Sequence, residues 1–154
     1  MKQILFSLFA IILINIACSS AKKANSVPEI QGIQGKVTEV TGNQMPMMGA
    51  PKAQPKGIKA SVFIYEKTNI NQVIQIGSSP IYTTINTKQV AFVETDSSGA
   101  FTFALPVGSY SLFIKQGNQF YANLFDSNNN IALFTVEEGK LTQVTLQINN
   151  RATY

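Results

Sequence analysis

Short runs of alternating apolar and polar residues begin at Ile33, continue almost to the end of the chain, and constrain its fold more than any other feature. Alternation with a period of two is typical of half-buried β-strands, and turn-forming residues separate the runs. We find no segment with the 3.6-residue period of an amphipathic helix. The alternation predicts strands at residues 33–40, 59–66, 72–76, 81–85, 89–95, 100–105, 109–115, 131–136 and 142–148. This spacing predicts an all-β domain over residues 33–150, an antiparallel β-sandwich of about seven strands in two sheets.

The clearest strands also show which side chains face the core. The predicted inward sets are Val62 and Ile64; Phe101, Phe103 and Leu105; Tyr110, Leu112 and Ile114; and Val144, Leu146 and Ile148. Turns at residues 95–99 and 106–108 separate three of these strands, with Asp96 placed to cap the first turn and Gly99 free to adopt a positive φ. We therefore expect a meander of three antiparallel strands from Gln89 to Lys115.

The first residues have the layout of a signal peptide. Lys2 precedes an apolar stretch over residues 4–14, and the small residue Ala17 stands directly before Cys18. A helix needs about 20 apolar residues to span a bilayer, and this stretch ends too early at Asn15. We therefore expect residues 1–17 to be a cleaved signal peptide rather than a membrane span.

Cys18 is the only cysteine, so no internal disulfide can form. Residues 16–18 resemble the end of a bacterial lipobox, although Asn15 departs from the usual aliphatic residue. The resemblance implies a diacylglycerol on Cys18 and a membrane anchor, with residues 18–32 as a flexible tether. Ser19 stands where the inner-membrane retention signal has Asp, which favours the periplasmic face of the outer membrane. The alternative is an ordinary signal peptide with an incidental cysteine.

The segment over residues 42–57 differs in composition from the rest. Its three prolines exclude a central strand, and it is long for a connection in a compact domain. Its three methionines, Met45, Met47 and Met48, suit an adaptable contact surface. Their thioethers could instead bind Cu(I).

Motifs spread along the domain resemble one family. They are GKVT at residues 35–38, ASVFI at residues 60–64, TDSSGAF at residues 95–101 and LPVGSY at residues 105–110. In this order they resemble the carboxypeptidase regulatory-like domain, a transthyretin-like sandwich related in architecture to immunoglobulin-like folds. The resemblance covers residues 33–148 and implies an accessory or interaction module without catalysis. Its recurring residues build turns and core, and it implies that Tyr110 enters the core beside Phe101.

Composition argues against several function classes. The chain has no histidine, which removes the commonest general base and the residue on which the 5-hydroxyisourate hydrolases of this fold class depend. The eight carboxylates are scattered and select no pair for glycoside hydrolysis. Loss of Lys2 with the signal peptide lowers the formal net charge from +4 to +3, and the lysines form no basic run for nucleic acid. We predict no enzyme, no cofactor and no nucleic-acid partner.

Two further segments allow two interpretations each. Residues 126–137 place oxygen-bearing side chains as an EF-hand loop does, but the sixth position is Ile131 instead of glycine, so we expect a polar loop and leave open a different Ca²⁺ site. The aromatic residues Phe120, Tyr121 and Phe125 either close the core or form a contact patch.

Three functional hypotheses follow. The first is a non-enzymatic lipoprotein that binds another protein of the bacterial cell envelope through the methionine-rich loop or a sheet edge. The second is a glycan- or peptide-binding module that uses Tyr65, Tyr82, Phe120 and Tyr121. The third, an enzyme, requires a cleft that brings two carboxylates together. The first is the interpretation we prefer.

Overall fold

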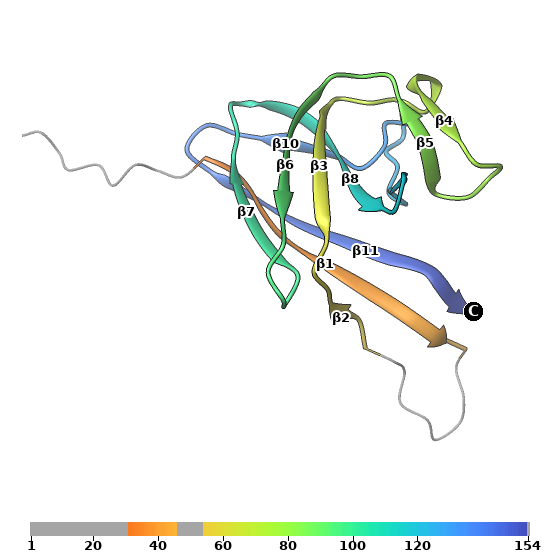
Figure 1. The fold of residues 1–154 in the computed structure, drawn as a ribbon. Helices are drawn as coiled ribbons and strands as arrows, with labels where there is room; N and C mark the ends of the chain where they lie inside the picture. The colour runs from red at the N-terminus through yellow and green to blue at the C-terminus, as the bar shows by residue number, and fades with distance from the viewer. Residues whose placement is uncertain (1–30, 46–53, 154) are drawn as a thin grey trace, which may run out of the picture.

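The computed structural model describes residues 31–45 and 54–153, and these residues form a β-sandwich (Figure 1). They contain strands, one single-turn 3-10 helix and no α-helix, which confirms the predicted fold class. The elements are β1 (Gly32–Asn43), β2 (Lys56–Gly57), β3 (Ser61–Glu66), η1 (Ile70–Gln72), β4 (Val73–Gln75), β5 (Ile81–Ile85), β6 (Gln89–Glu94), β7 (Ala100–Ala104), β8 (Gly108–Gln116), β9 (Gln119–Tyr121), β10 (Leu133–Val136) and β11 (Leu141–Thr153). Every predicted strand is present, and the short strands β2 and β9 are additional.

The signal peptide over residues 1–17, the lipid on Cys18 and most of the tether lie outside the described residues. The same holds for Met47 and Met48 in the methionine-rich loop. These features stay predictions.

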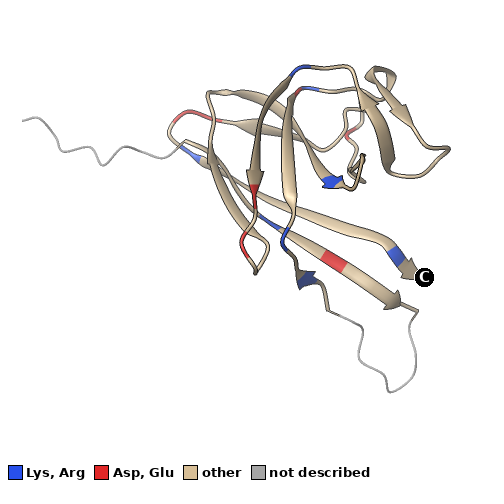
Figure 2. Ribbon diagram, in the orientation of Figure 1, with Lys and Arg blue, Asp and Glu red and all other residues tan. Residues whose placement is uncertain are grey.

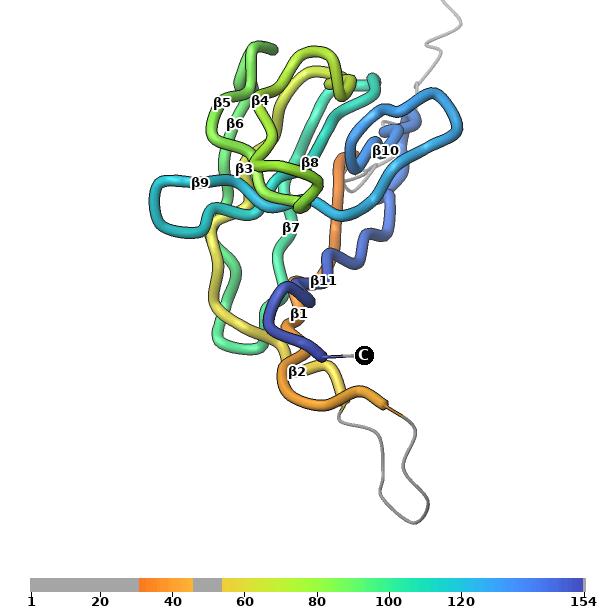
Figure 3. The backbone as a smooth tube through the Cα atoms, turned by 90° about the vertical axis from the view of Figure 1, so that its right-hand side faces the viewer, coloured from red at the N-terminus to blue at the C-terminus, as the bar shows by residue number. Residues whose placement is uncertain are grey.

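The smaller sheet is built around β1. On one edge β1 pairs with β11 in parallel, from Gly32 opposite Leu141 to Asn43 opposite Thr153. On the other edge its first half pairs with β7 and its second half with β2, both antiparallel. Figure 3 shows β1 and β11 running together toward the C-terminus. The parallel pair departs from the antiparallel expectation, and it is possible because β1 and β11 are far apart in sequence and need no tight turn between them.

The larger sheet has the strand order β4-β5-β9-β8-β3-β6 and is antiparallel throughout. Strand β8 is its centre and pairs with β3 on one edge. On the other edge β8 pairs first with β10 and then with β9. Strands β4 and β6 are therefore the edge strands at the two ends of this order, and β10 pairs with β8 alone among the described strands.

The predicted meander from Gln89 to Lys115 is wrong. Strand β6 pairs with β3 in the larger sheet, β7 pairs with β1 in the smaller sheet, and β8 returns to the larger sheet. Both connections therefore cross between sheets instead of closing hairpins within one sheet. A short turn places two strands close together, but it does not require them to pair with each other. The chain can also pass at this turn from an edge strand of one sheet to an edge strand of the other.

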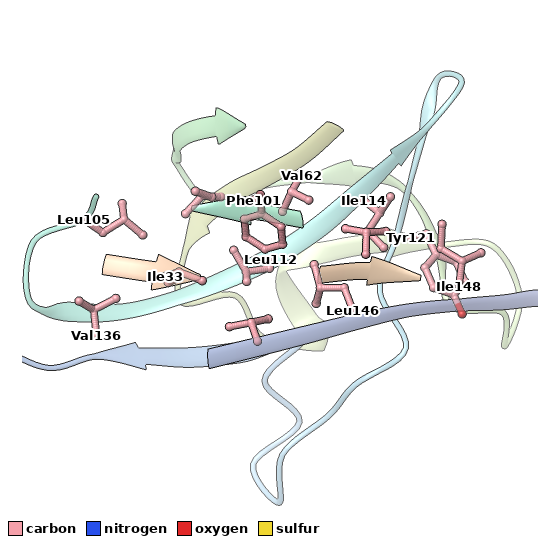
Figure 4. Close-up of a cluster of buried hydrophobic side chains, with 13 residues drawn as sticks. Ile33, Val62, Phe101, Leu105, Leu112, Ile114, Tyr121, Val136, Leu146 and Ile148 are labelled. Carbon is pink, nitrogen blue, oxygen red and sulfur yellow. The ribbon is translucent and has the colours of Figure 1, made fainter. Parts of the chain in front are cut away.

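The main core fills the space between the sheets (Figure 4). Nearly all predicted inward residues are buried in it, and Phe103 and Tyr110 pack against it while partly buried. The Tyr110 hydroxyl donates a hydrogen bond to the Pro106 carbonyl at 3.1 Å and so holds the corner before β8.

A second cluster lies on the other side of the larger sheet. Phe113 stands between Leu112 and Ile114 in β8, so its side chain points away from the main core, yet it is completely buried. It packs with Tyr65, Tyr82, Ala122, Ile131 and Ala132. This face of the sheet therefore carries packed apolar side chains instead of the usual solvated polar ones.

Candidate functional site

A row of aromatic rings crosses the outer face of the larger sheet. Phe92 of β6 lies opposite Phe63 of β3, and their rings stack with centroids 5.6 Å apart. Phe120 of β9 meets Phe63 edge to face at 5.5 Å. We call Phe63, Phe92 and Phe120 the aromatic face. Phe92 is 56% exposed, and the other two rings are half-buried.

Lys115 brings a positive charge to the aromatic face. It lies opposite Phe120 in the β8–β9 ladder, and its Nζ is 4.0 Å from the Phe120 ring centroid and 5.8 Å from that of Phe63. Within residues 31–45 and 54–153, the ion pairs are formed by other side chains, Lys140 with Glu137 and Arg151 with Glu39. The aromatic rings therefore hold the Lys115 ammonium by cation–π attraction, and the surface combines apolar area with one cation.

Buried rings support the aromatic face from below. Phe113 meets Tyr65 at 5.5 Å and Tyr82 at 5.7 Å, both edge to face. The Tyr82 hydroxyl donates to the Ala122 carbonyl at 3.3 Å. Burial, together with the nearby Tyr121, raises the pKa of Tyr82 to about 12. These contacts fix the positions of the rings beneath the surface.

The structure corrects the predicted set of contact residues. Tyr121 is only 1% exposed, and its hydroxyl donates to Asn149 Oδ1 at 2.7 Å. Tyr65 and Tyr82 are buried as well. None of these three rings can stack on a ligand at the surface, so they close the core. Phe120 remains on the surface as part of the aromatic face.

The sequence did contain a signal for Phe63 and Phe92. Both lie in continuous apolar runs, Phe63 between Val62 and Ile64, and Phe92 between Ala91 and Val93. Such runs indicate a strand with apolar side chains on both faces. Alternation singled out the inward members alone, so the outward rings were missed.

Met45 is the one methionine of the predicted contact set within the described residues. It is about half exposed, and its backbone N–H donates to Asn43 Oδ1 at 2.9 Å. A contact or Cu(I) role of Met45, Met47 and Met48 stays a prediction.

The loop at residues 126–130 is a turn stabilised by its own side chains. Asp126 Oδ1 accepts the backbone N–H groups of Asn128 and Asn130, and its Oδ2 accepts the Asn130 side-chain amide at 2.7 Å. The side-chain bond from Asn130 is the largest cause that lowers the pKa of Asp126. Both carboxylate oxygens therefore face N–H donors, which agrees with the polar loop that we expected. Residues 31–45 and 54–153 contain no group of three acidic, cysteine or histidine side chains placed to hold a metal.

A depression of about 350 Å³ lies where the chain passes from β7 to β8. We call it the corner pocket, and its lining residues are Glu66, Lys88, Val90, Pro106, Gly108, Ser109 and Tyr110. Apolar groups form most of it, while Glu66 and Lys88 place one charge of each sign beside it. The corner pocket contains one carboxylate, that of Glu66, whereas the enzyme hypothesis requires two.

Charged side chains are scattered over the strands and the turns (Figure 2). No helix within the described residues is long and apolar enough to cross a membrane. Comparisons with family models, with curated proteins and with solved structures find no match for this chain.

Proposed function

We propose that this chain is a non-enzymatic lipoprotein of the bacterial cell envelope that binds a protein partner. In this proposal a diacylglycerol on Cys18 holds it at the periplasmic face of the outer membrane, and its domain is of the carboxypeptidase regulatory-like, transthyretin-like type. The observation that carries the binding function is the aromatic face formed by Phe63, Phe92 and Phe120.

The energetics of the aromatic face favour a protein partner. An aromatic side chain contributes about 200 Å² when fully buried, so covering the exposed part of Phe92 would remove about 100 Å² from water. At about 25 cal/mol per Å² this is worth about 2.5 kcal/mol, as much as a hot-spot residue of an interface. Phe120 packs against Phe113 and Phe63, and Phe92 stacks on Phe63, so part of the side-chain entropy of these rings is already lost before binding.

A glycan partner is the second candidate. The observation that favours it is the Phe120 ring with the Lys115 ammonium 4.0 Å from its centroid, which offers both a stacking surface and a hydrogen-bond donor. A glycan array probed with the full chain tests this candidate, and absence of binding on the array counts against it.

A photo-crosslinking amino acid at position 92 tests the protein-binding proposal in the native membrane. Ile74 on β4 is the matched control site, because it is an equally exposed apolar residue on the opposite edge strand of the sheet. We expect one discrete crosslinked protein at position 92 and none at position 74. Equal crosslinking at both sites, or none at either, would contradict the proposal.

The anchor is tested separately by Cys18→Ser. We expect the wild-type chain in the membrane fraction and the variant in the soluble periplasmic fraction, because the lipid supplies the attachment. Membrane retention of the variant would contradict the lipid anchor.

A further inference from the structure

Strands β6 and β7 face each other with unpaired edges. Among the described residues β6 pairs with β3 alone, and β7 pairs with β1 alone. The strands touch beside the turn at residues 95–99 and diverge above it (Figure 1). Neither strand has a ladder partner on this side of the sandwich, and we call this pair of free edges the opening.

The edge of β6 offers backbone hydrogen-bonding groups at this opening. The Thr95 N–H donates to the Ala60 carbonyl at 2.9 Å, in line with the β3–β6 register. Because bonded pairs alternate in an antiparallel ladder, Val93 and Ala91 bond to β3, and the N–H and C=O of Phe92 point toward the open side. An extended peptide can form hydrogen bonds with a row of such backbone groups, whereas a small molecule reaches only one of them.

The corner pocket lies at the wide end of the same opening. Val90 of β6 lines it opposite Pro106 and Tyr110, and Val90 is about two-fifths exposed. Its volume of about 350 Å³ is near the lower limit of ligand sites, which suits one large apolar side chain better than a cofactor.

Two charges beside the pocket define the chemistry of the occupant further. The Glu66 N–H donates to the Lys88 carbonyl at 3.0 Å, so the two residues are neighbours across the ends of β3 and β6. Their side chains nevertheless form no ion pair with each other or with another described residue. Both charges are therefore available to side chains that flank the one in the pocket.

We propose that the opening between β6 and β7 binds an extended peptide strand of a partner protein. The strand pairs with the free edge of β6 and places a large apolar side chain in the corner pocket. An acidic side chain of the peptide faces Lys88 and a basic one faces Glu66. This inference deepens the proposed function, because it names the class of partner that the domain recognises.

The test uses the full chain in detergent and a displayed library of random peptides of about ten residues, enough for one strand and its flanks. We expect enrichment of peptides with a large apolar residue between an acidic and a basic one. Val90→Asp, which places a charge in the pocket, should lower the affinity for a synthetic copy of an enriched peptide by about tenfold or more. Ile74→Asp makes the same change on the opposite edge strand and should leave the affinity unchanged.

Two further variants separate edge pairing from pocket filling. Phe92→Pro and Phe92→Ala both remove the ring, but only the proline also removes the N–H that points to the free edge. Phe92→Pro should therefore weaken peptide binding about tenfold more than Phe92→Ala, while circular dichroism reports whether both variants stay folded. Lys88→Glu should change the enriched acidic position to a basic one. Absence of enrichment, or enriched peptides insensitive to Val90→Asp, overturns the inference. A dimer in sedimentation that Val90→Asp dissociates also overturns it, because a second copy would then fill the opening.

These outcomes are distinct from failure of the proposed function. Peptide binding in detergent does not depend on the lipid or on the membrane. Crosslinking at position 92 without peptide binding overturns the strand inference alone. Peptide binding by a chain whose Cys18→Ser variant stays in the membrane overturns the anchor alone.

Discussion

The turn at residues 95–99 and the loop at residues 126–130 share one hydrogen-bond pattern, which allows a matched pair of substitutions. In each, the aspartate Oδ1 accepts the N–H groups two and four residues later, and its carbonyl accepts the N–H three residues later. That third residue has a positive φ in both places, 85° at Gly99 and 60° at Asn129. We predict that Gly99→Ala destabilises the domain much more than Asn129→Ala does.

The magnitudes follow from the surroundings of the two residues. An alanine in the left-handed region costs about 1 kcal/mol, and Asn129→Ala adds no new atom there. At Gly99 a Cβ would lie 2.1 Å from the Val37 carbonyl oxygen. The Val37 N–H donates to the Gly99 carbonyl at 2.8 Å, so movement that relieves the overlap weakens this bond to β1. We expect Gly99→Ala to lower the free energy of unfolding by about 3 kcal/mol, or the Tm by about 10 °C.

Urea unfolding followed by circular dichroism measures both variants against the parent chain. The difference between them isolates the steric effect, because the left-handed backbone is common to both. Equal losses for Gly99→Ala and Asn129→Ala would refute the steric reasoning. A loss near zero for both would refute the left-handed geometry as well.

Three predictions concern pH and buried polar groups. Hydrogen bonds in the folded state, first from Ser98 to Asp96 and from Asn130 to Asp126, lower the pKa of both carboxyls, so their stabilisation is full above their ordinary pKa near 3.8 and is lost as pH falls through the lowered values. The Tm should fall more steeply below pH 4 in the parent than in a variant with both aspartates changed to Asn. The pKa of Tyr82 is raised from 10.0 to about 12, so stability should decrease as pH rises from 10 to 12, and Tyr82→Phe should reduce this decrease in urea unfolding. Thr38 Oγ1 is buried without a hydrogen-bond partner among the described residues, so Thr38→Val should raise the free energy of unfolding by about 1 kcal/mol in the same assay.

The positions of the strands could be predicted because the signal is local. At residues 81–85 the predicted and observed bounds of β5 agree, and Val144, Leu146 and Ile148 of β11 are buried at alternate positions as expected. Each of these predictions depends only on neighbours within one strand. The same holds for Gly99, whose positive φ follows from the short turn in which it lies.

Strand pairing could not be predicted in the same way. The turn between β6 and β7 has hairpin residues, and its aspartate and glycine do form the expected local bonds. The two strands nevertheless belong to different sheets, because β6 pairs with β3 and β7 pairs with β1, and both of these partners are remote in sequence. The parallel pairing of β1 with β11 joins the two ends of the domain, and no local pattern carries that information.

The aromatic face could not be predicted because, in a strand covered on both faces, the sequence does not show which face of the sheet an apolar residue occupies. From the sequence, Tyr65 and Tyr82 were candidates for stacking on a ligand, but both are buried in the second cluster. Phe63 and Phe92 have the sequence context of ordinary strand residues, but Phe63 packs against the border of that cluster, and Phe92 stacks on Phe63 and stays exposed. Only the arrangement of β4, β5 and β9 around β8 decides which rings are covered.

The properties of β6 favour a specific partner over self-association. A free edge beside an exposed ring is an aggregation hazard, and proteins reduce it with charges and bulges at the edge. Lys88 and Glu94 lie at the two ends of β6, and the β3–β6 register is interrupted between Ile64 and Tyr65, beside Val90. A second copy of β6 would bring a second interruption of the same kind to the pairing. A peptide strand carries no interruption of its own, and one with an acidic residue for Lys88 and an apolar one for the corner pocket matches the groups at this end of β6.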